Sequence, residues 1–244
     1  MPQIIHLAQT DSTNTYLRQQ LMAHPDLEEG SVVWADYQRA GRGQKGNSWE
    51  SEEKANLLFT LLLCPDSIRA RDQFIISQLV SLGMIDVLNS LHEGFSVKWP
   101  NDIYYHDKKA VGILIENDMA GQNLINSFIG IGLNVNQKKF VSDAPNPVSL
   151  FQILGKETER EPLLMQIIER ILYYYQMACD GDYQTIQALY RQHMYRNKGF
   201  HTFCDAEGSF QAEIDDVALS GLLTLRTDKG IKKTYDFKEV QFVI

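Results

Sequence analysis

Residues 57–63 (LLFTLLL) form a short apolar run that is interrupted only by Thr60. A continuous run of this length is typical of a strand that is buried on both faces. The run is far below the roughly 20 residues that a helix needs to span a bilayer. The sequence therefore predicts a sheet that is covered on both faces at this strand.

A long core helix is predicted after this strand. Ile75, Leu79, Leu82 and Leu88 keep helical spacing within residues 70–91. The other expected elements are a helix that starts at Asp11 or Ser12 and ends near His24-Pro25, helices over 162–178 and 182–195, strands over 31–37, 95–99 and 103–105, and a hairpin of 110–117 and 124–135 that turns near Gly121.

The pattern changes near residue 195, where short alternating strands replace the helices. Residues 137–162 read as a connector, and glycines at 208, 221 and 230 supply turns in the last part of the chain. We therefore expect an α+β fold with a mixed or antiparallel central sheet flanked by helices. The predicted division is a catalytic-type domain over 1–195 and a small β domain over 196–244.

The 244 residues carry 23 Lys+Arg against 31 Asp+Glu, a net charge of −8. This balance argues against a nucleic-acid binder that uses a broad basic face. The three cysteines (Cys64, Cys179, Cys204) show no paired spacing, so neither a disulfide framework nor a zinc site is indicated. No signal peptide is visible, and the expected location is the cytoplasm.

The loop 39–48 (RAGRGQKGNS) matches G-x-G-x-x-G, yet two nucleotide-binding interpretations fail. A dinucleotide site needs a helix directly after the loop and an acid about 20 positions on, and a P-loop needs G-K-[ST]. Neither is present. The loop does hold Arg39, Arg42 and Lys45 among exposed backbone amides, which suits an anion cradle, although a solvated surface loop explains it equally well.

A second cluster is SVKWPND (96–102), in which Lys98 stands in an otherwise apolar strand. A buried lysine is costly unless it meets an anion, whereas an edge lysine can extend to solvent. The Pro-Asn-Asp turn can aim two polar side chains at one place. Both interpretations of Lys98 remain open from these residues alone.

Three weaker motifs follow the same logic. Lys109 precedes an apolar strand and is most simply a surface charge. Gly130 and Gly132 lie within the strand GIGLNVN, where glycines often mark a close approach of a ligand or of another backbone. Asp-Ser-Thr-Asn (11–14) is in itself only a helix N-terminus. No histidine spacing suits a transition metal, and no G-x-S-x-G elbow occurs.

Taken together and in this order, the motifs resemble those of the biotin–protein ligases. The matching segments are STN (12–14), YQRAGRGQKGNSW (37–49), KWPND (98–102), KKAVGILIE (108–116) and GIGLNVN (130–136). The resemblance implies a class II aminoacyl-tRNA synthetase-like ligase fold with a C-terminal SH3-like β-barrel. It also implies formation of biotinyl-5'-AMP from biotin and ATP, with Mg²⁺, and transfer of biotin to a lysine of a biotin carboxyl carrier protein.

The resemblance assigns roles residue by residue. Biotin would contact Ser12, Thr13, Asn14, Gln38, Gly41, Arg42, Gly43, Lys109 and Gly112. ATP or the adenylate would contact Arg42, Gln44, Lys98, Trp99, Asn101, Asp102, Gly132 and Asn134. Catalysis would rest on Arg42, Lys98, Lys109 and Asp102, and no protein-bound metal site is expected beyond Mg²⁺ on the ATP phosphates.

The loop departs from the family pattern at Gln44 and Asn47, which stand at commonly basic positions. We expect this change to weaken retention of the adenylate unless Lys45 compensates. The measurement is biotinyl-AMP dissociation from the wild type and from Gln44→Arg, in which the arginine should slow release.

The chemistry agrees with the resemblance. A carboxylate is a poor electrophile and needs activation as a mixed anhydride, and this step brings two anions together, so cations must gather at the site. No covalent nucleophile is required. Asp102 is a candidate base or orienting group for the carrier lysine.

Two alternatives remain at this stage: a lipoate or octanoate ligase of the same superfamily, and a non-catalytic biotin-binding module. Since the STN motif begins at Ser12, we expect the monofunctional type without a DNA-binding domain. We expect no nucleic-acid or membrane partner, and a homodimer is consistent with the family.

Overall fold

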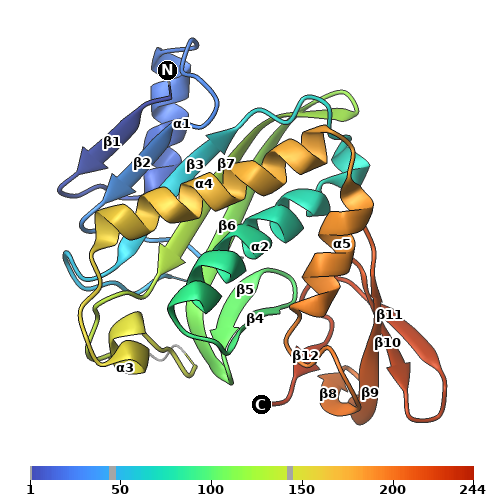
Figure 1. Ribbon diagram of the computed structural model, residues 1–244. Helices are drawn as coiled ribbons and strands as arrows, with labels where there is room; N and C mark the ends of the chain where they lie inside the picture. The colour runs from blue at the N-terminus through green and yellow to red at the C-terminus, as the bar shows by residue number, and fades with distance from the viewer. Residues whose placement is uncertain (1, 44–47, 142–144) are drawn as a thin grey trace.

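A computed structural model describes residues 2–43, 48–141 and 145–244. Its main sheet has seven strands in the order β1-β2-β3-β7-β6-β5-β4 (Figure 1). β1 and β2 are parallel and all other neighbours are antiparallel, so the mixed sheet is confirmed. The strands are β1 (Ile4–Leu7), β2 (Val32–Ala35), β3 (Leu57–Leu63), β4 (Phe95–Lys98), β5 (Asp102–Tyr105), β6 (Lys108–Ala120) and β7 (Asn123–Leu133).

β3 has the bounds that the apolar run predicts, and every one of its residues is buried. It pairs with β2 on one side and β7 on the other. Leu57, Phe59 and Leu61 point into the large core, whereas Leu62 belongs to a smaller cluster on the opposite face. Both faces are therefore covered, because strand side chains alternate in direction.

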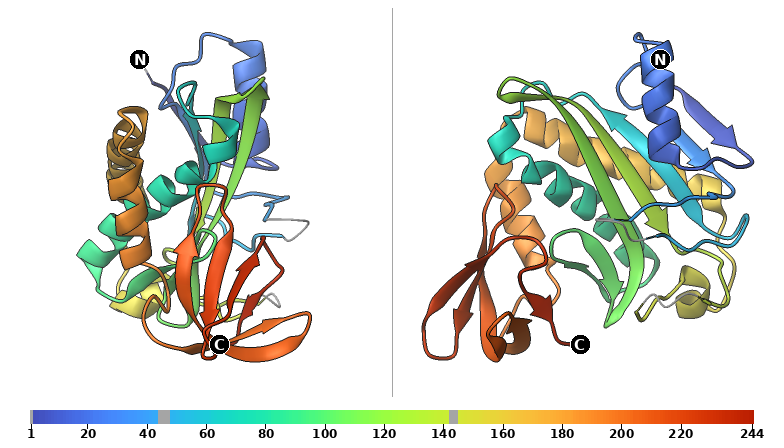
Figure 2. Two further views of the ribbon diagram at one scale, coloured as in Figure 1. Left: turned by 90° about the vertical axis from the view of Figure 1, so that its right-hand side faces the viewer. Right: turned by 180° about the vertical axis from the view of Figure 1, so that it is seen from behind.

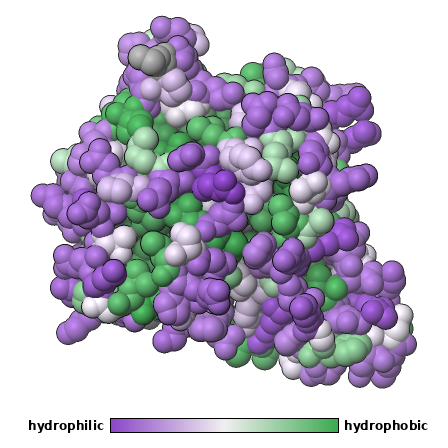
Figure 3. All heavy atoms as spheres, viewed as in Figure 1, coloured by the Kyte–Doolittle hydropathy of each residue, from purple (hydrophilic) through white to green (hydrophobic). Residues whose placement is uncertain are grey.

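Three helices cover one face of the sheet. These are α2 (Phe74–Leu91), α4 (Arg160–Cys179) and α5 (Tyr183–Gln192), which lie together in Figure 1. α2 and α4 cross so closely that a Cβ on Gly83 would lie 2.7 Å from Ile171 Cγ1. By length and hydropathy α2 could cross a membrane, but 72% of it is buried inside the protein, as expected of a core helix. The outer surface of this layer is largely hydrophilic (Figure 3).

The helix predicted at the N-terminus is α1 (Thr13–Ala23), with Ser12 as its N-cap. It lies on the other face of the sheet from α2 and α4 (Figure 2). Leu17 packs there with Val33, Leu62 and Phe128 in a cluster of five buried residues. Because this cluster is small, it leaves the rest of that face available for a site.

Two segments differ from expectation. The β6–β7 hairpin is longer than predicted because its turn is only Gly121 and Gln122, with φ of +61° at Gly121. The predicted connector contains the short helix α3 (Leu150–Leu154), which starts with a capping box of Ser149 and Gln152. A helix of five residues is too short to show a 3.6-residue period, so periodicity could not find it.

A second, antiparallel sheet forms the C-terminal part, as expected. Its order is β11-β10-β9-β8-β12, and no pairing closes it into a barrel within the described part of the chain. The strands are β8 (His201–Asp205), β9 (Gly208–Val217), β10 (Leu223–Thr227), β11 (Lys232–Tyr235) and β12 (Gln241–Phe242).

The two sheets share one continuous core. Trp99 Nε1 donates a hydrogen bond to Gly221 O at 2.9 Å, and its ring lies 5.3 Å from that of Phe237. Phe74 of α2 also contacts Phe237. The division at residue 195 stays a prediction, because buried residues continue across it.

Candidate functional site

A cavity of about 870 Å³ opens on the face of the main sheet that carries α1. Most residues that the sequence assigned to ligands line it together, although they come from five separate segments. They are Ser12, Thr13, Asn14, Gln38, Arg42, Gly43, Lys98, Asn101, Asp102, Lys109, Gly112, Gly132 and Asn134.

Three assigned residues stand apart. Trp99 does not line the cavity, because its side chain is buried against the C-terminal sheet through Gly221 and Phe237. The structure thus gives Trp99 a packing position, and its expected adenylate contact stays a prediction. Gly41 lies beside the lining, where its carbonyl accepts from the backbone N–H of Trp49. Gln44, with Lys45 and Asn47, falls outside the described residues, so the expected effect on adenylate retention stays a prediction.

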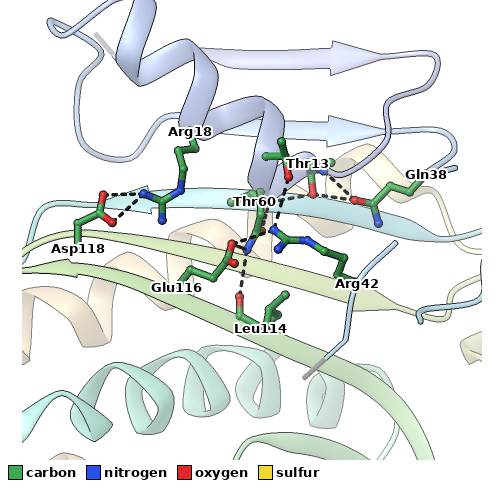
Figure 4. A network of polar contacts seen from close by, with 10 residues as sticks. Thr13, Arg18, Gln38, Arg42, Thr60, Leu114, Glu116 and Asp118 are labelled. Atoms are coloured by element: carbon green, nitrogen blue, oxygen red, sulfur yellow. Dashed lines mark hydrogen bonds and ion pairs between the residues drawn. The ribbon is translucent and has the colours of Figure 1, made fainter. Parts of the chain in front are cut away.

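The start of α1 supplies one end of the cavity. The first backbone N–H groups of a helix lack partners within the helix. Here Thr13 N donates to Gln38 Oε1 at 2.8 Å, and Thr13 Oγ1 lies 3.1 Å from the same oxygen (Figure 4). Two donors therefore hold Gln38 Oε1, and its Nε2 has no hydrogen bond to a described residue. This NH₂ group is a donor that a ligand can use.

Thr60, which the motifs did not identify, connects α1 to the centre of the sheet. It is fully buried on β3, and its Oγ1 lies 2.6 Å from Asn14 Oδ1 and 2.8 Å from Thr13 Oγ1. The orientation of the Asn14 amide follows from its other side, because Nδ2 faces two groups that can only accept and Oδ1 is left to the Thr60 hydroxyl. Those acceptors are Glu116 Oε2 at 2.9 Å and Leu114 O at 3.4 Å.

Glu116 also binds the glycine loop. Its Oε2 accepts from Arg42 Nη2 at 3.1 Å, while Arg18 Nη1 lies within hydrogen-bonding distance of both carboxylate oxygens of the nearby Asp118 (Figure 4). Glu116 belongs to the matched segment 108–116 but received no role from it. A charge-assisted pair across 74 residues of sequence leaves no local pattern, so the sequence could not indicate it.

Glycines form the floor of the cavity. Gly112 and Gly132 are opposite each other on β6 and β7, and the Trp49 indole lies directly on them. A Cβ on either glycine would come within 2.5 Å of the indole ring. Gly130 is equally restricted, since a Cβ there would lie 2.3 Å from Asn14 Oδ1. The strand glycines thus mark close approaches, but the groups that approach are the side chains of Trp49 and Asn14, whereas the sequence predicted a ligand or another backbone.

Cations gather at the other end of the cavity. Lys109 Nζ lies 2.7 Å from Asp102 Oδ2. Lys98 Nζ lies between the rings of Tyr104 and Phe242, at 5.1 and 5.3 Å. Burial lowers the pKa of the Lys98 ammonium. Asp102 raises this pKa, and Lys109 and Arg196 lower it. An anion that binds here would stabilise the charged form of Lys98.

Two buried polar atoms of the lining have no hydrogen-bond partner among the described residues. They are Trp49 Nε1, a donor, and Asn134 Oδ1, an acceptor. The other atom of the Asn134 amide, Nδ2, donates to Val148 O at 3.2 Å. Since buried polar groups are rarely left unpaired, these two atoms are positions where a polar ligand can bind.

No group of three or more His, Cys, Asp or Glu side chains suited to a metal ion occurs in residues 2–43, 48–141 and 145–244. Asp102 is the carboxylate of the cation-rich end. A single carboxylate provides too few ligands to hold a divalent ion without further oxygen ligands from a bound molecule. Lys238, from the C-terminal sheet, also lines the cavity and was not expected from the motifs.

Comparison with known proteins gives a consistent result. A model of the biotin/lipoate A/B protein ligase family matches residues 6–134. The bifunctional ligase/repressor BirA of Bacillus subtilis (strain 168) is 30% identical over 226 residues, which cover 88% of this chain and 67% of that protein. The biotin--[acetyl-CoA-carboxylase] ligase of Paracoccus denitrificans is 31% identical over 131 residues, 53% of each chain.

Among solved structures, the chain resembles the biotin protein ligase from Aquifex aeolicus in complex with biotin and ATP. The TM-score is 0.79 at 25% identity, and the match covers 100% of both chains. The similarity thus includes the C-terminal sheet as well as the cavity-bearing part.

Proposed function

The chain belongs to the biotin/lipoate A/B protein ligase family, and from this premise we propose that it is a biotin–protein ligase. It joins biotin to ATP, forms biotinyl-5'-AMP with release of pyrophosphate, and passes the biotinyl group to a lysine of a carrier protein. The observation that carries the proposal is the cavity, which gathers a polar end at α1 and a cationic end at Lys98 and Lys109. Biotin has a matching polarity, with a ureido ring at one end and a carboxylate at the other.

The ureido ring is proposed to bind at the start of α1. Gln38 Nε2 is directed by the bonds that hold Oε1 and can donate to the ureido oxygen. Ser12 has no capping hydrogen bond from its side chain, so its hydroxyl remains for the ligand. Thr13 and Asn14 are held by Thr60 before any ligand arrives. This preorganisation reduces the entropic cost of binding.

The carboxylate end is proposed to lie among Arg42, Lys98 and Lys109. A biotin carboxylate oxygen attacks the α-phosphorus of ATP, and pyrophosphate leaves. Both reactants are anionic, so fixed positive charge lowers the barrier most when it faces the phosphorus that is attacked. Lys98 is suited to this role because its own burial is unfavourable until an anion compensates it.

In the second step, the neutral amine of the carrier lysine attacks the acyl carbon, AMP leaves with the bonding electrons, and the nitrogen loses a proton. Asp102 is the proposed orienting group for that amine. It is paired with Lys109 at 2.7 Å in this structure and is accessible from the cavity. Gly41 and Gly43 are proposed to border the intermediate and to help exclude water, which would hydrolyse the mixed anhydride.

The adenylate is proposed to border Asn101, Gly132 and Asn134. Asn134 Oδ1 is an acceptor without a described partner at this place, which suits the donor groups of a nucleoside. Mg²⁺ would be held by the ATP phosphates with Asp102 as the carboxylate that the protein contributes, and it would neutralise phosphate charge. The indole of Trp49 covers Gly132 here, so a ligand reaches this glycine at the edge of the indole or after the indole has moved.

The proposed partner is the biotin carrier of a carboxylase, because a relative is named as the ligase of acetyl-CoA carboxylase.

The proposed location is the cytoplasm, with which the three cysteines agree, since all of them are described and none forms a disulfide. We propose no repressor role for these residues, since a net charge of −8 does not favour DNA binding. We also propose that two copies of this chain form a homodimer.

The test is incubation with biotin, Mg-ATP and a carrier domain, followed by intact mass and by biotin-dependent ATP–pyrophosphate exchange. A biotinyl mass shift together with exchange is expected. Replacing biotin by lipoate or octanoate should give neither. Exchange that depends on lipoate would favour the sister activity, and binding of biotin without exchange would reject catalysis.

A further inference from the structure

Glu116 contacts two parts of the site that are distant in sequence. One carboxylate oxygen, Oε2, accepts from Asn14 Nδ2 at 2.9 Å and from Arg42 Nη2 at 3.1 Å (Figure 4). Asn14 belongs to α1, beside the proposed ureido site, and Arg42 belongs to the glycine loop. Glu116 thus joins the start of α1, where the ureido ring is proposed to bind, to the arginine of the glycine loop.

The link depends on the register between α1 and β6. Residues 14 and 18 are one helical turn apart, about 6 Å, and residues 116 and 118 are separated by a similar distance along a strand. The result is two parallel contacts, Asn14 with Glu116 and Arg18 with Asp118. Both attach α1 to β6, but only Glu116 also reaches Arg42.

Arg42 needs such an anchor. Its side chain is 47% exposed and would otherwise sample many rotamers. Nη2 bonds Glu116 and lies 3.5 Å from Thr15 Oγ1, whereas Nε and Nη1 have no hydrogen bond to a described residue. One edge of the guanidinium is therefore held, and the other edge remains available to an anion in the cavity.

We propose that Glu116 is a positioning residue that holds Arg42 toward the phosphate of the adenylate and couples this arginine to the ureido site through Asn14. The inference rests on the proposed ligase function. The alternative is that Glu116 competes with the phosphate for Arg42, and it makes the opposite prediction, because loss of the carboxylate would then slow release of the adenylate.

The experiment compares Glu116→Gln with Asp118→Asn. Glutamine keeps an oxygen that can accept from Asn14 but removes the charge that holds Arg42. Adenylate dissociation, measured on preformed biotinyl-AMP complex, should be about 10-fold faster in E116Q, while Kd for biotin without ATP stays within about twofold. D118N removes the neighbouring charge from the same strand and should release the adenylate at the wild-type rate.

Release from E116Q at the wild-type rate or more slowly, or equal acceleration in D118N, would overturn the inference. In an Arg42→Ala background, E116Q should have no further effect, which a merely structural role would not produce. If E116Q does not fold, Glu116→Asp, which withdraws the carboxylate by one methylene, should also accelerate release. A wild type that shows no biotin-dependent exchange would instead reject the proposed function itself.

Discussion

Gly130 shows how strictly single residues define the cavity. A methyl group at this position would lie 2.3 Å from Asn14 Oδ1. Asn14 cannot easily move away, because Thr60 holds its oxygen and Glu116 holds its nitrogen. The glycine is therefore required by a side chain whose own position is fixed from two directions.

Gly130→Ala should weaken biotin binding by about 10-fold or more, since overpacking a fixed contact costs about 1–3 kcal/mol. The measurement is calorimetric Kd for biotin, with thermal melting to show that the variant is folded. Wild-type affinity in folded G130A would contradict the assignment of Asn14 to the biotin site.

Lys98 is a residue whose contribution to stability should oppose its contribution to function. Its pKa is lowered from 10.5 chiefly by burial. The unfolded chain thus binds the proton more tightly than the folded protein, so the destabilisation is fully present below the folded pKa and declines as pH rises toward the unfolded value.

Lys98→Met should therefore raise Tm at pH 7 by about 2 °C, and the gain should shrink as pH approaches about 10. Adenylate formation should fall by about 100-fold or more. Lys108→Met, at an exposed lysine near the start of β6, is the control and should change neither property. A K98M variant that is less stable than the wild type at every pH would contradict this account.

At the scale of elements, the contact between α1 and β3 determines the polar end of the cavity. Thr60 is the polar residue in the apolar strand β3, and it is completely buried. The sequence showed the interruption but no reason for it, because the partners Thr13 and Asn14 lie 47 and 46 residues away.

Thr60→Val keeps the shape of the side chain and removes both hydrogen bonds. Leaving buried partners unsatisfied costs about 1–3 kcal/mol, so Tm should fall by several degrees and biotin affinity by about 10-fold. Ser81→Ala is a matched control, since Ser81 Oγ is buried in α2 without a described partner and is not part of the cavity lining. Equal loss of biotin affinity in both variants would mean that the effect of Thr60 is not local.

The sequence predicts best the elements that are long enough and buried enough for their hydrophobic pattern to be read along their whole length. β3 is buried along its whole length and α2 along most of its length, so their sequences carry the continuous apolar run of a doubly buried strand and the helical period of a core helix. The short helix α3 depends on its capping box and on a left-handed Gly155 instead. Its formation depends on local interactions at its two ends, which a search for hydrophobic periods does not detect.

At the scale of the whole molecule, the contiguous motifs predicted most of the cavity lining because each motif carries several lining residues. Lys238, which also lines the cavity, was not predicted, nor were Glu116 and Thr60, which hold lining residues in place, since their positions depend on strand register and on packing between the sheets. Trp99 shows the reverse case. It lies within the motif 98–102, but its side chain packs at the contact between the two sheets, against Gly221 and Phe237; we call this contact the joint.

This joint should couple the C-terminal sheet to the cationic end of the cavity. Lys238 lines the cavity, and Phe242 of β12 lies 5.3 Å from Lys98 Nζ. The ureido end has no such contact with the C-terminal sheet among the residues that line it in the described structure. Loosening the joint is therefore expected to affect the nucleotide more than biotin.

Trp99→Phe removes the hydrogen bond to Gly221 O and keeps an aromatic ring against Phe237. Tm should fall by about 4 °C, because a buried carbonyl loses its donor, and KM for ATP should rise about 3- to 10-fold with Kd for biotin unchanged. Trp34→Phe, at a buried tryptophan of β2, should lower stability without moving KM for ATP. If W34F raised KM as much as W99F, the effect would be global destabilisation. A difference between them would make the C-terminal sheet a functional wall of the nucleotide site, because the two variants remove similar indoles and differ in which sheet they loosen.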